Sequence, residues 1–195
     1  MDSISNKHPI EKVVLLDSSG NPCGTIEKSR VHTMNTPLHS AFSVFLFDGK
    51  GNMLTQQRAL TKNTWPGIWS NACCGHPAPG ESHMNAVKRR LKEELGLEEV
   101  NLTLALPNFR YQAIYQGVME NEICPVFIGF PRADIKIIHN PLEVKAVKWV
   151  SWTEFFQACE NPINTPFESF SPWSLMEGKL LQATPWITQL LRKTA

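Results

Sequence analysis

Charged residues recur at a fixed spacing between residues 75 and 97, where they could bind a cation and a phosphate group. Five residues separate Gly75 from Glu81, and seven residues separate Glu81 from Arg89. Residues 89–97 then read Arg-Arg-Leu-Lys-Glu-Glu-Leu-Gly-Leu. Carboxylates are the ligands that hard divalent cations prefer, and guanidinium groups match the geometry of phosphate oxygens. The segment therefore predicts a site for a metal-bound diphosphate.

This spacing resembles the Nudix box, the motif of enzymes that hydrolyse nucleoside diphosphate derivatives. One residue departs from the motif, because Arg90 stands where the box has a glutamate that binds metal. A cation at this position can still help to bind the diphosphate, but it lowers the negative charge that holds the metal cluster of a hydrolase. We therefore expect a different reaction on a diphosphate ester.

The charged residues of the box are placed by a predicted amphipathic helix. Four apolar residues fall within roughly 80° of one another on the helical wheel, namely Met84, Val87, Leu91 and Leu95. Gly96 follows them, where a left-handed C-terminal cap is expected. The wheel places Arg90 and Glu94 at the edges of the apolar stripe, beside the core. Arg89 and Glu93 lie nearly opposite, on the solvated face.

Two carboxylates and three imidazoles form a second candidate metal site. Glu120 and Glu122 are one residue apart in a strand-like run, so both side chains point to one face, roughly 6 to 7 Å apart. Taken by itself, the glutamate pair would suit an exposed strand face. The apolar residues around the pair instead favour a buried strand whose carboxylates bind a cation. His32, His39 and His76 could complete five or six ligands, which suits Mn, Mg or Zn.

A cysteine pair lies in the loop that precedes the box. Cys74 could present its thiol, or its backbone carbonyl, to whatever the box binds. A free thiol has a pKa of about 8.5, so it is mostly protonated at neutral pH and can donate a proton. Cys73 is the rival candidate. Since neighbouring side chains point apart, only one of the two can face the pocket.

Apolar runs and turn residues outline the elements that must position these groups. Strands are predicted over residues 13–16, 22–26, 39–47, 53–58, 109–113, 120–130 and 144–150. The first four of these strands are expected to form two hairpins, and residues 28–38 an irregular segment. Besides the box helix, helices are predicted over residues 153–160 and from Ser171, an N-cap followed by Pro172. These elements indicate an α/β layered sandwich, a mixed β-sheet flanked by helices.

Composition bounds the class of protein. With 195 residues and 42% hydrophobic content, the chain suits one domain over residues 1–195, with a flexible segment at residues 1–12. The net charge of +1 gives no reason to expect a nucleic-acid or membrane partner. The five cysteines are odd in number, and the first twelve residues hold no apolar run. We therefore expect a reduced, cytoplasmic location. We also expect a monomer.

Several short segments resemble one family within the Nudix superfamily, the type I isopentenyl-diphosphate delta-isomerases, in their bacterial form. These segments are residues 38–42, 65–67, 74–77, 120–125 and 171–173. The likeness extends from about Val13 to about Trp173. It implies a Nudix-like fold and a reversible 1,3-allylic proton shift that converts isopentenyl diphosphate into dimethylallyl diphosphate through a carbocation.

The resemblance also implies roles for individual residues. Cys74 would transfer a proton on one face of the substrate and Glu122 on the other, assisted by the hydroxyl of Tyr111. Trp173 would cover the cation, because an aromatic ring face stabilises a nearby positive charge. By the same likeness, five residues would bind one divalent metal, namely His32, His39, His76, Glu120 and Glu122.

A second ion, Mg, would bind the substrate diphosphate, with Glu94 and the carbonyl of Cys74 as its protein ligands. By the same resemblance, four cations would surround the phosphate oxygens, namely Lys28, Arg58, Lys62 and Arg90. Two other functions remain open from the residues alone. One is a Nudix hydrolase that acts on a nucleoside diphosphate derivative, and the other is a metal-stabilised binding module without catalytic activity.

Overall fold

The computed structural model describes residues 10–160 and 170–193. Its strands are β1 (Lys12–Leu16), β2 (Pro22–Glu27), β3 (His39–Ser40), β4 (Phe42–Leu46), β5 (Asn52–Arg58), β6 (Trp69–Ser70), β7 (Cys73–Gly75), β8 (Val100–Leu106), β9 (Arg110–Tyr115), β10 (Val118–Ile123), β11 (Val126–Pro131) and β12 (Val144–Ser151). Its helices are α1 (Lys28–Val31), α2 (His83–Leu95), α3 (Trp152–Glu160), α4 (Pro172–Ala183) and α5 (Pro185–Lys193).

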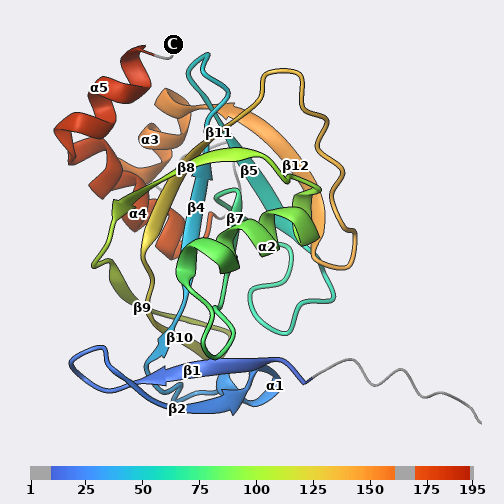
Figure 1. Cartoon of the computed structure of the whole chain (residues 1–195), viewed down its shortest axis with the longest axis vertical. Helices are drawn as coiled ribbons and strands as arrows, with labels where there is room; N and C mark the ends of the chain where they lie inside the picture. Colours follow the sequence, from blue (N-terminus) through green and yellow to red (C-terminus); the bar gives the residue numbers. More distant parts are fainter. Residues whose placement is uncertain (1–9, 161–169, 194–195) are drawn as a thin grey trace, which may run out of the picture.

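The strands form three sheets, with helices on two sides of the central one. The sheet orders are β2-β1-β3-β10-β9, β7-β4-β11-β8 and β12-β5-β6. Figure 1 shows α2 in front of the β7-β4-β11-β8 sheet, with α3 and α4 on the other side and the β1–β2 hairpin at one end of the molecule. Parallel and antiparallel strand pairs both occur. The expected α/β layered sandwich with mixed β-structure is confirmed.

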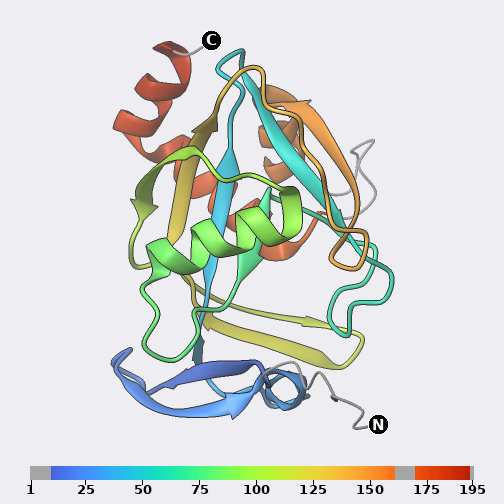
Figure 2. The same cartoon turned by 45° about the vertical axis from the view of Figure 1, so that its right-hand side comes forward.

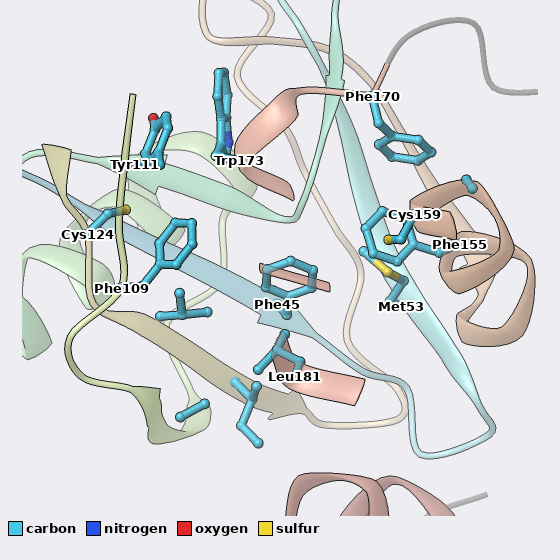
Figure 3. Packing of buried hydrophobic residues seen from close by; sticks show 14 of the residues in the cluster. Phe45, Met53, Phe109, Tyr111, Cys124, Phe155, Cys159, Phe170, Trp173 and Leu181 are labelled. Atoms are coloured by element: carbon cyan, nitrogen blue, oxygen red, sulfur yellow. The ribbon is translucent and has the colours of Figure 1, made fainter. Parts of the chain in front are cut away.

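Strand β4 separates the two hydrophobic clusters of the core. Its side chains alternate, as a pleated strand requires: Phe42 and Val44 pack in the cluster that includes α2, and Phe45 packs in the cluster that includes α3 and α4. Figure 3 shows Phe45 beside Leu181 of α4. Ser43 shares the face of Phe45, so its hydroxyl points toward α4.

The two long strands predicted at residues 39–47 and 120–130 are each divided in two. β3 and β10 pair in parallel in one sheet, and β4 and β11 pair in parallel in the next. The amides of Ala41 and Ser43 donate to the carbonyls of Ile123 and Pro125, so the pairing continues across the break. Pro125 has no N–H to offer a ladder, which favours the change of sheet at this point. The strands were predicted correctly in position but not in their division.

The second predicted hairpin, from residues 39–47 and 53–58, is wrong. β5 pairs with β12 and β6, and only an isolated bridge between Phe47 and Met53 links its start to the preceding strand. The first hairpin, β1 with β2, is confirmed. Of the segment 1–12 that was expected to be flexible, residues 1–9 lie outside the described residues, and Lys12 already belongs to β1.

The box helix is confirmed as α2. Ser82 caps its first turn by accepting a hydrogen bond from the amide of Asn85, and Gly96 ends it in the left-handed conformation with φ of 70°. Arg90 and Glu94 are buried, as the wheel predicted. Glu93 is on the solvated side, with its side chain 44% exposed. The helix thus presents one cation and one carboxylate toward the interior.

Some elements were not predicted. Residues 28–38 contain the one-turn helix α1, and β6, β7, β8 and α5 were absent from the sequence expectation. β6 and β7 are short strands in the loop between β5 and α2, where no apolar period could be recognised.

Figure 2 shows β9 and β10 between the β1–β2 hairpin and the rest of the molecule. Within the described residues, no helix is both long and apolar enough to cross a bilayer.

Helix α4 is held close to α3 by a glycine. A Cβ atom at Gly178 would lie 2.6 Å from a ring carbon of Phe155 and 2.8 Å from the sulfur of Cys159. We expect Gly178→Ala to lower the free energy of unfolding by about 1 to 3 kcal/mol, because an overpacked core must shift its backbone. Thermal unfolding followed by circular dichroism measures this. Lys179→Ala, an exposed change on the same helix, is the control, and equal melting temperatures for both variants would contradict the prediction.

Candidate active site

A cavity of about 510 Å³ brings together most of the residues that the sequence singled out. The predicted residues that line it are Lys28, His32, Arg58, Lys62, Cys74, His76, Arg90, Tyr111, Glu120, Glu122 and Trp173. His39 and Glu94 are outside this lining but contact residues within it. We call this space the central cavity. Segments far apart in the chain therefore supply a single site.

Strand pairing places the histidines against the glutamates. His39 is the parallel partner of Glu122 across β3 and β10, and Tyr111 is the antiparallel partner of Glu122 across β9 and β10. The Oε1 atom of Glu122 lies 3.3 Å from the Nε2 atom of His39 and 3.1 Å from the Nε2 atom of His76. His32 follows α1 and points its ring at the other two imidazoles.

These side chains form a cluster suited to a metal ion. One ligand atom from each of His32, His39, His76 and Glu122 lies within 4.8 Å of the others. Glu120 is outside that group, but its Oε2 atom lies 2.9 Å from the Nε2 atom of His32. The five predicted ligands are therefore contiguous, with Glu120 at the edge.

Unpaired polar atoms in the cluster support the fit to a cation. Among the described residues, the Nδ1 atom of His76 is buried without a hydrogen-bond partner. The Nε2 atoms of His32 and His39 and the Oε2 atom of Glu120 are also buried, and they lie close to an oppositely charged or polar atom without a well-aligned hydrogen bond. Buried polar atoms are normally paired, because leaving one unpaired costs about 1 to 3 kcal/mol. A divalent cation accepts electron pairs from imidazole nitrogens and carboxylate oxygens. The donor set thus fits a metal that takes mixed nitrogen and oxygen ligands.

Electrostatics keep the cluster ready for a cation. Burial lowers the pKa of His76 to about 4, so this imidazole is neutral at neutral pH. Burial alone would lower the pKa of His39, but the adjacent carboxylate of Glu122 outweighs it and raises that pKa. Burial opposes ionisation of Glu122, yet the neighbouring imidazoles of His39 and His76 hold its pKa well below the usual value. Glu122 is therefore a carboxylate.

Cys74 approaches the cavity from β7. Its sulfur donates a hydrogen bond to the Oδ1 atom of Asn71 at 3.3 Å and lies 3.4 Å from the Oγ atom of Ser43. Burial, together with the charge of Glu177, raises the pKa of Cys74 to about 12, so the group is a thiol. Cys73 instead lies in the hydrophobic cluster under α2 and is fully buried. Only Cys74 of the pair lines the cavity.

Aromatic residues complete the wall between the two candidate proton-transfer groups. The hydroxyl of Tyr111 donates to the Oε2 atom of Glu122 at 2.9 Å. The rings of Tyr111 and Trp173 have centroids 5.8 Å apart, and Figure 3 shows them side by side. The indole N–H of Trp173 donates to the Oγ atom of Ser70 at 3.1 Å, which fixes the ring plane.

The predicted phosphate-binding cations are held by neighbours that sequence reasoning missed. Lys28 lies 2.6 Å from a carboxylate oxygen of Glu11, and Lys62 contacts Glu143. Arg58 instead donates to the backbone carbonyls of Thr64 and Trp65, so it also anchors the loop after β5. No motif in the sequence distinguishes these two glutamates from ordinary surface residues.

Arg90 and Glu94 bind each other on one face of α2. Two nitrogens of Arg90 donate to the Oε1 atom of Glu94, at 3.0 and 2.5 Å, and Arg90 also lies 3.1 Å from Glu143. The Oε2 atom of Glu94 accepts a hydrogen bond from Gln56 at 3.3 Å. Burial opposes the charge of Arg90, but Glu94 dominates and raises its pKa. The role of Glu94 and of the Cys74 carbonyl as magnesium ligands stays a prediction.

Comparisons with known proteins show what the chain is similar to. The model of the NUDIX domain matches residues 37–169. An isopentenyl-diphosphate Delta-isomerase of Saccharopolyspora erythraea is 52% identical over 75% of this chain and 75% of its own length. Those of Mycolicibacterium vanbaalenii and Salmonella typhi are 47% and 44% identical, each over 89% of this chain and 92% and 93% of their own lengths.

Solved structures confirm the fold at much lower sequence identity. A protein of Deinococcus radiodurans superimposes with a TM-score of 0.64 at 14% identity, covering 85% of this chain and 96% of its own. A MutT NUDIX hydrolase of Burkholderia pseudomallei has a TM-score of 0.53 at 17% identity, covering 73% and 96%. The three relatives compared above are all isopentenyl-diphosphate Delta-isomerases. The chain belongs to the isopentenyl-diphosphate Delta-isomerase family of NUDIX-domain proteins.

Proposed function

We propose that this protein interconverts isopentenyl diphosphate and dimethylallyl diphosphate by moving a proton between two carbon atoms. The observation that carries the proposal is that a thiol, Cys74, and a carboxylate, Glu122, line the same cavity and have no hydrogen bond to each other. A short hydrocarbon chain between them would meet an acid on one side and a base on the other.

The proton balance follows from the states of these two groups. The thiol of Cys74 donates its proton to the terminal carbon of the substrate double bond, which forms a C–H bond and leaves a tertiary carbocation. Glu122 then accepts a proton from the neighbouring methylene carbon, and the electrons of that C–H bond form the new double bond. The reverse reaction uses the same groups in opposite roles. General acid and base catalysis of this kind contributes about 10²- to 10⁴-fold.

Aromatic residues support the charge that develops. Trp173 presents its ring to the cavity, and a ring face near a cation is worth about 0.5 to 2 kcal/mol. Tyr111 keeps its proton, because burial and then the charge of Glu122 raise its pKa well above the usual value. Its hydroxyl can therefore hold the Oε2 atom of Glu122 throughout the reaction. An aromatic wall also limits the approach of water to the carbocation from that side.

Metal binding is part of the proposal. One divalent ion, Mn, Zn or Mg, would be held by His32, His39, His76, Glu120 and Glu122, and a magnesium ion with the diphosphate by Glu94 and the carbonyl of Cys74. Such ions, when bound, supply positive charge that fixes carboxylates and neutralises phosphate oxygens. The diphosphate would be bound by four cations, namely Lys28, Arg58, Lys62 and Arg90.

We also propose that the whole chain forms one domain and acts as a monomer in the cytoplasm. The odd number of cysteines supports a reduced location.

One assay tests the proposed function. Pure protein is incubated with isopentenyl diphosphate and Mg²⁺ in deuterated water, and the products are analysed by NMR and mass spectrometry. We expect dimethylallyl diphosphate, with deuterium in both the substrate and product pools and no released phosphate. Released phosphate without isomer would instead identify a hydrolase. Metal uptake without any reaction would leave a binding module.

Glu143 competes with the substrate for two of the cations. Its carboxylate contacts Lys62 and lies 3.1 Å from Arg90, at the edge of the central cavity. Removing this charge in Glu143→Gln should lower the Kd for inorganic pyrophosphate about three- to tenfold, because the anion no longer displaces an ion pair. Calorimetric titration in the presence of Mg²⁺ measures the change. Glu98→Gln, which removes an exposed carboxylate, is the control. Weaker binding by Glu143→Gln would show that the carboxylate positions the cations instead.

A further inference from the structure

A carboxyl group behind Cys74 has no place in the proton transfers described so far. Glu177 lies on α4 and is 0% exposed. Its Oε2 atom accepts a hydrogen bond of 2.8 Å from the hydroxyl of Ser43 on β4, 134 residues earlier in the chain. Burying a carboxyl group is costly unless it makes a specific contact, so Ser43 is the partner that accounts for its position. Burial, and then the charge of Glu122, raise the pKa of Glu177 well above the usual value.

Ser43 links this carboxyl group to the thiol. Its Oγ atom lies 3.4 Å from the sulfur of Cys74, and it accepts a hydrogen bond of 2.8 Å from the side-chain nitrogen of Asn71. A serine hydroxyl has one hydrogen to donate and two lone pairs. When that hydrogen points to Glu177, one lone pair serves Asn71 and the other faces the sulfur.

The orientation of Asn71 is fixed by its own contacts. Its side-chain nitrogen donates to Ser43 and to the backbone carbonyls of Val44 and Cys73, at 2.8, 2.9 and 3.2 Å. Its Oδ1 atom must therefore be the one that faces Cys74, 3.3 Å from the sulfur. This oxygen is an acceptor, so it directs the thiol hydrogen but offers none of its own.

We propose that Glu177 is a positioning residue for Cys74 and that it acts through Ser43. By accepting the hydroxyl hydrogen of Ser43, it leaves the sulfur facing the lone pairs of Ser43 and Asn71, the side-chain hydrogen-bond partners within 3.5 Å in the described structure. The one hydrogen of the thiol then donates to the Oδ1 atom of Asn71, while the Ser43 oxygen offers a second acceptor beside it. Without Glu177, the Ser43 hydroxyl is free to turn its hydrogen toward the sulfur, and the thiol loses the acceptor that helps to hold it in one orientation. This inference rests on the proposed function of Cys74 as the acid.

Three variants separate an acceptor role from other roles. Glu177→Leu removes the acceptor, and we expect kcat for isopentenyl diphosphate to fall about tenfold, which corresponds to about 1.4 kcal/mol, while KM stays within about twofold. Glu177→Gln keeps a neutral acceptor oxygen and should retain kcat within about threefold. Ser43→Ala removes the link, and adding Glu177→Leu to it should cause no further loss, because the two residues act as a unit. Met176→Leu, a change at the partly exposed neighbouring residue, is the matched control.

Infrared spectroscopy gives a readout that does not depend on turnover. The S–H stretching band of Cys74, identified by its loss in Cys74→Ala, should shift in Glu177→Leu and in Ser43→Ala but not in Glu177→Gln or Met176→Leu. An unchanged band and unchanged kcat in Glu177→Leu would overturn the inference. So would a loss in Glu177→Gln as large as in Glu177→Leu, because a charge or a transferable proton would then be needed. If Glu177→Leu does not fold, Ser43→Ala tests the same contact from the other side.

Failure of the proposed function is distinguishable from failure of this inference. Wild-type protein that does not isomerise its substrate, but whose Cys74 band still shifts in Glu177→Leu, would refute the reaction and keep the hydrogen-bond arrangement. Wild-type protein that isomerises normally, with a Glu177→Leu variant of equal kcat and equal band position, would keep the reaction and refute the positioning role.

Discussion

Replacing Cys74 by alanine should reduce isomerisation by about 10²- to 10⁴-fold, the contribution expected of a general acid that is lost. The thiol is held between Ser43 and Asn71 at the wall of the cavity and keeps its proton, and alanine has no proton to donate in its place. The measurement is the rate of deuterium incorporation from solvent. The melting temperature should change little, because removing one half-buried sulfur leaves a small void.

The neighbouring cysteine provides a matched control for this prediction. Cys73 is fully buried among the apolar residues beneath α2, so Cys73→Ala should lower stability slightly and leave the rate near that of the wild type. The two variants delete the same atoms from adjacent positions, and only one of them faces the substrate. Full activity in Cys74→Ala, or an equal loss in Cys73→Ala, would refute the assignment of the acid.

Replacing Glu122 by glutamine should abolish turnover and also reduce the metal content of the purified protein. An amide cannot accept the proton from the substrate carbon, and it is a weaker ligand than the carboxylate that lies within 3.3 Å of His39 and 3.1 Å of His76. We expect a loss of at least about 10³-fold in kcat, within the range for a general base. Elemental analysis and steady-state kinetics measure the two effects.

Glu120→Gln separates loss of metal from loss of the base. Glu120 lies 2.9 Å from His32 at the edge of the ligand cluster. The hydroxyl of Tyr111 donates to Glu122 and not to Glu120. Its variant should bind the metal more weakly but recover activity when excess metal is supplied. Glu122→Gln should not recover. Recovery of Glu122→Gln by metal alone would show that its carboxylate serves only as a ligand.

The helix that carries the box could be predicted because its signals are local. The apolar period from Met84 to Leu95, the glycine at position 96 and the order of the charges all lie within one segment, and α2 follows them closely. The positions of most strands were also readable from apolar runs. Their assignment to sheets was not, because β-pairing joins residues far apart in sequence, as between Phe42 and Gly75.

The site was predictable only where a motif or family likeness marked the residues. His32, His39, His76 and Glu122 were proposed together, and the fold brings their ligand atoms within 4.8 Å. Glu177 had no such mark: a lone glutamate in a mixed helix is indistinguishable from a solvated one until the fold places it against a serine of another strand. Glu143 escaped notice for the same reason.

The stretch of backbone that runs from β3 into β4 sets the positions of both reacting groups. In β3, His39 is paired with Glu122 of β10. Four residues later, in β4, Ser43 is paired with Cys74 of β7. The acid and the base are thus registered on a single short stretch of backbone. A slip of one residue in this stretch would therefore misplace both groups together.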